Sequence, residues 1–81
     1  MDTKQLTIKL AMVVSTLGET TKPGESIPAS TIYLALGSNL EHYNLLAGVG
    51  ERMGWVKTTP ETIGLTPAGR VKAQEFAALG I

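Results

Sequence analysis

The chain has 81 residues and no cysteine, so neither a disulfide bond nor a thiolate metal site can supplement its hydrophobic core. A chain of this length has room for a single domain, residues 1–81, and buries only a modest fraction of its surface. We therefore expect one core of marginal stability, which association with a second copy would strengthen. Hydrophobic residues make up 43% of the chain and charged residues 17%, which indicates a globular rather than a disordered protein.

The first helix is predicted over residues 4–17, where apolar side chains recur at helical spacing. Gly18 is expected to end this helix, because glycine is a common helix stop. Residues 19–25 are polar and rich in turn-forming types, so they predict a loop within the domain. The expected apolar face of the helix comprises Leu6, Leu10, Val13, Val14 and Leu17.

Two further helices separated by a tight turn are predicted over residues 28–53. Residues 26–28 precede them as a short extended segment, since the residue before a proline avoids the helical conformation. The second helix, residues 28–36, is expected to be largely buried, and Gly37 to close it. Ser38 and Glu41 match a capping box, which predicts the start of a third helix that runs to about Met53.

The third helix is expected to bury one side and to expose the other near its start. Gly48 and Gly50 each lower its helix propensity by about 1 kcal/mol, and we expect them to let helices approach closely. The expected apolar positions are Leu40, Tyr43, Leu46, Ala47 and either Val49 or Gly50.

A β-hairpin and a last helix are predicted for the rest of the chain. Residues 55–59 are β-prone, Pro60 and Glu61 favour a turn, and residues 62–65 form the second strand. Thr66 as the N-cap and Pro67 as the first helical residue start a helix that runs through Leu79. Its expected apolar face comprises Ala73, Phe76 and Ala77. The predicted class is mainly α with a small antiparallel β-hairpin (α+β).

In this order the elements resemble the winged helix-turn-helix family of bacterial and phage regulators, over roughly residues 26–72. Gly37 stands where the family has its turn glycine. The distance from there to residues 54–56 (Gly-Trp-Val) fits a recognition helix followed by the wing, about residues 55–65. Residues 65–70, Leu-Thr-Pro-Ala-Gly-Arg, resemble the family's junction between the wing and the next helix. Two positions depart from the family pattern: Ser38 replaces an apolar residue, and Arg52 is the single arginine or lysine of the third helix.

The resemblance implies a DNA-binding transcriptional regulator, expected to act as a homodimer. The third helix would lie in the major groove, and the wing would contact the DNA backbone or minor groove. Asn44 could pair with an adenine edge, Glu41 could accept a hydrogen bond from cytosine, and Leu45 could meet a thymine methyl group. The residues expected to contact nucleic acid are Ser38, Asn39, Glu41, His42, Asn44, Leu45, Arg52, Lys57, Thr58, Thr59, Arg70 and Lys72.

The charge distribution supports an alternative function, a winged helix that binds or assembles with a protein without binding DNA. The net charge is zero, and residues 38–61 contain two basic and three acidic residues, a net charge of −1. DNA-binding domains usually carry a basic face, because neutralised phosphates supply most of their affinity. Helix capping, solvation and strand propensity are also sufficient to account for the polar residues singled out above. RNA binding is less favoured, since no ladder of aromatic side chains is visible.

Catalysis and membrane association are not expected. The chain has one histidine, His42, no pairing of a nucleophile with a base, and no glycine loop preceded by a strand, so we expect no enzyme activity, cofactor or metal. The longest apolar stretch, residues 10–14, is too short to span a bilayer. Residues 1–5 lack the pattern of a signal peptide. The expected location is the cytoplasm.

Overall fold

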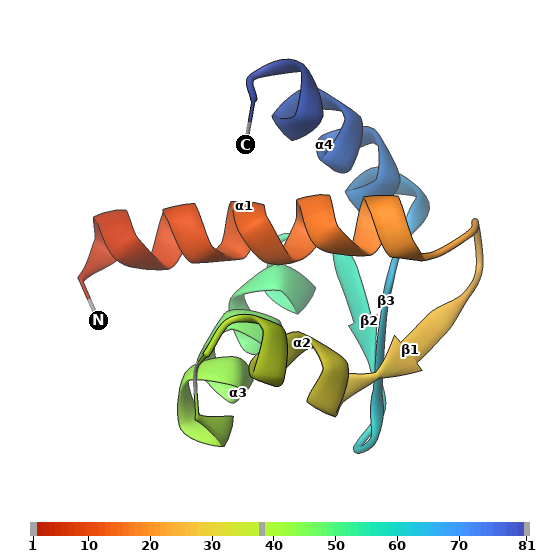
Figure 1. Ribbon diagram of the computed structural model, residues 1–81. Coiled ribbons are helices and arrows are strands. Elements are labelled where there is room, and N and C mark those ends of the chain that lie inside the picture. Colours follow the sequence, from red (N-terminus) through yellow and green to blue (C-terminus); the bar gives the residue numbers. More distant parts are fainter. Residues whose placement is uncertain (1, 38, 81) are drawn as a thin grey trace.

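The computed structural model describes residues 2–37 and 39–80, which form four helices and a three-stranded antiparallel sheet. The helices are α1 (Thr3–Thr20), α2 (Ala29–Ala35), α3 (Leu40–Arg52) and α4 (Pro67–Ala78). The strands are β1 (Ser26–Pro28), β2 (Val56–Thr58) and β3 (Thr62–Leu65). The prediction of a mainly helical α+β chain is confirmed (Figure 1).

Strand β3 lies at the centre of the sheet, between β1 and β2. The predicted hairpin is confirmed: β2 and β3 pair antiparallel, with Val56 opposite Leu65. The predicted extended segment at residues 26–28 is also present, and it forms a third strand in which Ile27 lies opposite Ile63. This pairing joins the segment that follows α1 to the far edge of the hairpin.

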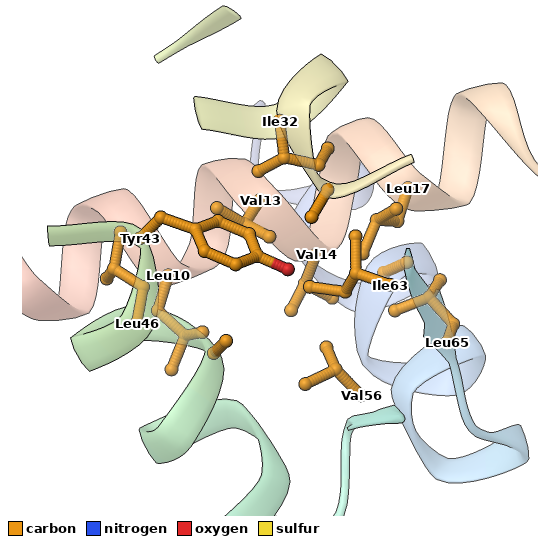
Figure 2. Packing of buried hydrophobic residues seen from close by; sticks show 13 residues of the cluster. Leu10, Val13, Val14, Leu17, Ile32, Tyr43, Leu46, Val56, Ile63 and Leu65 are labelled. Atoms are coloured by element: carbon orange, nitrogen blue, oxygen red, sulfur yellow. The ribbon is translucent and has the colours of Figure 1, made fainter. Parts of the chain in front are cut away.

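The hydrophobic core lies between α1, α2, α3 and the inner face of the sheet (Figure 2). Full burial of one valine or leucine side chain contributes about 1.5–3 kcal/mol to the free energy of unfolding. The core side chains therefore pack α1 against the other elements. Figure 1 shows α1 running across α2, α3 and the sheet. The largest fully buried side chains are Val14, Leu17, Ile32, Leu46 and Ile63, which come from α1, α2, α3 and β3.

Gly18 does not end α1, contrary to the prediction, because the helix continues to Thr20. A Cβ atom on Gly18 would lie 2.7 Å from the Cβ of Ala73 in α4. The glycine therefore serves the close contact between α1 and α4. Ala73 is buried and Phe76 half-buried, as expected, whereas Ala77 is exposed and does not belong to the buried face.

Helix α2 is shorter and less buried than predicted. It begins at Ala29, after Pro28 as the N-cap, and ends at Ala35. Ala29 and Ile32 are its buried residues, while Leu34 is 73% exposed. Because the helix has only about two turns, only a narrow stripe of its side chains faces the core.

The N-cap of α3 is Asn39, not Ser38. The Asn39 Oδ1 atom accepts a hydrogen bond from the His42 backbone N–H at 2.9 Å, and the helix begins at Leu40. This start places Glu41 one position too early for the predicted capping box, while Ser38 itself lies outside the described residues. Leu40 is 57% exposed, contrary to the prediction. The predicted buried positions Tyr43, Leu46, Ala47 and Gly50 are confirmed.

The two glycines of α3 have different environments. A Cβ atom on Gly50 would lie 2.8 Å from the Val56 Cγ2 atom and 3.4 Å from the Leu10 Cδ1 atom, so this glycine lets both strand β2 and helix α1 approach α3. A Cβ atom on Gly48 would meet nothing within 4 Å. The expectation of a close approach is thus confirmed at Gly50 and wrong at Gly48.

Residues 65–70 join the hairpin to α4 through the predicted cap, which is confirmed. The Thr66 Oγ1 atom accepts a hydrogen bond from the Gly69 N–H at 3.0 Å and donates one to the Gly54 carbonyl, and Pro67 is the first residue of the helix. A Cβ atom on Gly69 would overlap the Trp55 carbonyl oxygen. Only glycine fits this position without moving the backbone.

We expect Gly48→Ala and Gly50→Ala to change stability in opposite directions. Alanine at Gly48 gains helix propensity without a clash and should raise the free energy of unfolding by about 0.5–1 kcal/mol. Alanine at Gly50 meets Val56 and should lower it by about 1–3 kcal/mol. Urea denaturation of both variants measures the difference. Equal stabilities would mean that α3 and β2 are not packed this closely.

Candidate binding surface

Helix α3 exposes one face, and one edge of this face lines a groove. Asn44, Gly48 and Glu51 line the groove, which is described below. Glu41, Leu45 and Arg52 lie beside them on the same face, because residues three and four apart are neighbours on a helix, but they do not line the groove. His42, predicted to face outward, is half-buried.

A groove of about 590 Å³ separates α3 from the start of α2 and the tip of the hairpin. We call it the α3–hairpin groove. The backbone N–H of Ala29 donates a hydrogen bond to the Glu61 carbonyl at 2.8 Å, which ties the hairpin tip to the start of α2. The groove is lined by Pro28, Ala29, Ser30, Tyr33, Leu40, Tyr43, Asn44, Ala47, Gly48, Glu51, Thr58, Thr59, Pro60 and Glu61.

At the hairpin tip, the hydroxyl group of Thr59 forms its hydrogen bonds within the turn. The Thr59 Oγ1 atom accepts hydrogen bonds from the backbone N–H groups of Glu61, at 3.3 Å, and Thr62, at 3.0 Å. It also lies 2.6 Å from the Thr62 hydroxyl. Thr58 is half-buried. Both predicted wing threonines line the groove, but Thr59 already has partners within the turn.

The charges that line the α3–hairpin groove are all negative. Glu51 lies on the α3 wall and Glu61 on the hairpin wall, and both are exposed. No lysine or arginine is among the described residues that line the groove. Two carboxylates of the same sign, placed between protein walls of low dielectric constant, create a negative potential that favours a positively charged ligand.

The predicted supporting cations lie elsewhere and have partners. The Arg70 guanidinium donates hydrogen bonds to the Thr21 carbonyl, at 3.1 Å, and to the Thr21 hydroxyl, at 3.0 Å. Lys72 forms an ion pair with Glu75 at 2.8 Å, and its Nζ atom lies 5.3 Å from the centre of the Trp55 ring. These contacts stabilise the packing of α4, because the cations bind Thr21 just after α1, Glu75 within α4 and Trp55 just before β2.

Lys57 and Arg70 are brought together on the other side of the hairpin. Both line a shallow second groove beside Pro23, Pro67 and other residues that follow α1 or start α4. The Lys57 Nζ atom donates a hydrogen bond to the Gly24 carbonyl at 3.3 Å. This groove shares no lining residue with the α3–hairpin groove. A smaller hollow beside Ser26 and Thr62 brings Lys57 together with Thr58 and Thr59, so the three predicted wing residues share one surface.

Tyr43 forms part of the floor of the α3–hairpin groove. Its side chain is 6% exposed, and its Oη atom has no hydrogen-bond partner among the described residues. Figure 2 shows the ring lying across the gap between α3 and Ile63 of the sheet. The Tyr33 ring packs against it edge-on, with centroids 5.8 Å apart. Burial, and secondarily the negative charge of Glu51, raises the pKa of the Tyr43 hydroxyl above its ordinary value of 10.0.

The residues that make the α3–hairpin groove acidic and aromatic do not stand out in the sequence. Glu51 and Glu61 enter the sequence-based prediction only through the local net charge. Tyr43 enters it only as a core residue. One signal was available: Tyr43, Ala47 and Glu51 recur at a spacing of four, which puts them along one side of α3.

Within residues 2–37 and 39–80, no group of three or more histidine, aspartate or glutamate side chains gathers to hold a metal ion. The same residues contain no helix whose length and hydropathy suit passage through a membrane.

Comparison with known proteins gives no relative to set beside these surfaces. No protein-family model matches the chain, no curated protein matches it, and no solved structure matches it.

We expect Tyr43→Phe to stabilise the protein and Tyr43→Ala to unfold much of it. Phenylalanine keeps the ring and removes a buried hydroxyl without a partner, which should raise the free energy of unfolding by about 1 kcal/mol. Alanine leaves a cavity that should lower it by about 3–5 kcal/mol. Chemical denaturation checks both values. A loss of stability in Tyr43→Phe would mean that the hydroxyl is hydrogen-bonded.

Tyr43 also predicts how stability changes with pH. Because its folded-state pKa is raised, the unfolded chain loses this proton first, and the free energy of unfolding should fall as pH rises through about 10. Below that pH the contribution is fully present. Tyr43→Phe should show a shallower fall over the same alkaline range, measured by urea denaturation at stepwise pH. Identical slopes for the two proteins would contradict the raised pKa.

Proposed function

We propose that the chain is a winged helix-turn-helix module that binds a protein partner through α3 and the hairpin. The order of elements supports the fold assignment: a helix and a short strand precede α2 and α3, and the hairpin follows. The pairing of β1 with β3 supports it further, since the short strand completes the sheet that carries the wing.

The observation that carries the choice of partner is the negative α3–hairpin groove. In a winged helix that binds DNA, α3 and the wing face the phosphate backbone, which lysine and arginine must neutralise. Here Glu51 and Glu61 line the groove between those two elements, and Glu41 lies in the first turn of α3. Arg52, in the last turn, is the single lysine or arginine of α3.

Exposed leucines on α2 and α3 support a protein partner. Leu34 is 73%, Leu40 57% and Leu45 44% exposed. The centre of a protein interface is enriched in apolar residues and poor in charge, with polar groups at its rim. Leucines beside a charged groove fit this composition.

DNA binding is the second candidate, and two observations favour it. Asn44 is exposed on α3, where an amide can contact an adenine edge. Lys57 and Arg70 line the second groove together and would offer positive charge to a phosphate. This arrangement would place the DNA backbone on the far side of the hairpin from the α3–hairpin groove.

Paired leucine variants test the protein-binding function. Affinity capture from cell extract, with the retained proteins identified by mass spectrometry, should hold a partner with the wild type and lose it with Leu45→Glu. Leu79→Glu is the matched control, because it adds the same charge at an exposed leucine that ends α4. It should retain the partner.

Fluorescence anisotropy with random duplex DNA tests the second candidate. We expect no binding at low salt, about 50 mM, where phosphate contacts are strongest. Binding that appears at low salt and falls steeply toward about 200 mM would overturn the choice of a protein partner.

A further inference from the structure

The α3–hairpin groove presents negative charge from two separate elements. Glu51 projects from the C-terminal half of α3, and Glu61 belongs to the hairpin tip. Neither carboxylate forms an ion pair among the described residues. The ion pair found among them joins Lys72 and Glu75. A group that enters the groove therefore meets uncompensated negative charge on both walls.

The floor of the groove is aromatic rather than polar. Tyr43 lines the groove, but its Oη atom is buried from solvent and has no hydrogen bond among residues 2–37 and 39–80. The charged acceptors that an entering group can reach are therefore the exposed carboxylates of Glu51 and Glu61.

Apolar surface surrounds these polar groups. Tyr33, Leu40 and Ala47 line the groove, and Gly48 leaves open space above α3 because a Cβ atom there would meet nothing within 4 Å. The groove volume of about 590 Å³ lies in the range of pockets that hold a small ligand or a few side chains. An aliphatic stem with a positively charged end fits such a lining, since the stem packs on apolar surface while the end reaches the acids.

We propose that the α3–hairpin groove binds an arginine side chain, flanked by an apolar residue, from a basic segment of the partner protein. The guanidinium lies between Glu51 and Glu61 and donates hydrogen bonds to their carboxylates. The adjacent apolar residue packs on Leu40 and Tyr33. Arginine fits better than lysine, because its planar fork carries five donors and so serves several acceptors at once. This inference rests on the proposed protein-binding function and names the chemistry of the partner.

Titration of the ¹⁵N-labelled full chain with a short, blocked peptide of alternating arginine and leucine tests this proposal. Chemical-shift changes should concentrate at Gly48, Glu51, Thr59 and Glu61. The same peptide with citrulline in place of arginine keeps the shape and loses the charge, and it should bind about tenfold more weakly or not at all. Equal binding of the two peptides overturns the proposal.

Charge-neutral variants locate the binding. Glu51→Gln and Glu61→Gln should each weaken the arginine peptide several-fold, whereas Glu19→Gln, the same change at an exposed residue near the end of α1, should leave its affinity unchanged. Equal effects of all three glutamine variants would indicate attraction by overall charge and overturn the site.

The failure of this inference differs from the failure of the proposed function. If the Leu45→Glu variant loses a captured partner but the arginine peptide does not shift the groove, the inference is wrong and the protein-binding function stands. If duplex DNA binds at low salt and shifts the groove residues, both are overturned.

Discussion

The contact between Gly69 and the Trp55 carbonyl is the constraint on which the positions of the other elements depend. That carbonyl accepts a hydrogen bond from the Thr66 N–H at 3.0 Å and leaves no room for a Cβ atom on Gly69. One residue later, Arg70 binds Thr21 just after α1. The start of β2, the start of α4 and the end of α1 are therefore attached within one short segment. The Trp55 N–H donates a hydrogen bond to the Gly50 carbonyl at 2.9 Å, which attaches α3 to the same segment.

The sequence was sufficient to predict elements whose limits are set by neighbouring residues. Thr66 and Pro67 mark the start of α4 because the cap and the first turn involve only adjacent positions. The limits set by distant residues were not predictable in this way. Gly18 has the chemistry of a helix stop, but its neighbour across the helix contact is Ala73 of α4, and the need for a small residue there appears only in the fold. Ser38 and Asn39 are both suitable caps, and the burial of Tyr43 and Leu46 sets the phase of α3.

The groove proposed as a binding site lies between two elements that the sequence predicted, α3 and the hairpin, but its chemistry was only partly predictable. The sequence pointed to α3 and the hairpin and revealed a local excess of acidic residues. It did not reveal that Glu51 and Glu61 line one groove, because a helix and a turn ten positions apart meet only once β2 has packed on Gly50. It also did not reveal that Arg70 and Lys72 stabilise the packing of α4. Their contacts with Thr21 and Trp55 form only in the folded structure. The same packing leaves the groove without a cation of its own.

The central place of β3 has a consequence for the mechanics of recognition. A two-stranded ribbon that stands free in solvent bends easily, and ordering it on a ligand reduces affinity. Here β1 covers the other edge of β3, and Ala29 holds the turn through the Glu61 carbonyl. The spacing between the two acidic walls is consequently fixed by the fold itself, and in the proposed binding of an arginine the length and shape of the side chain would decide which residue is accepted.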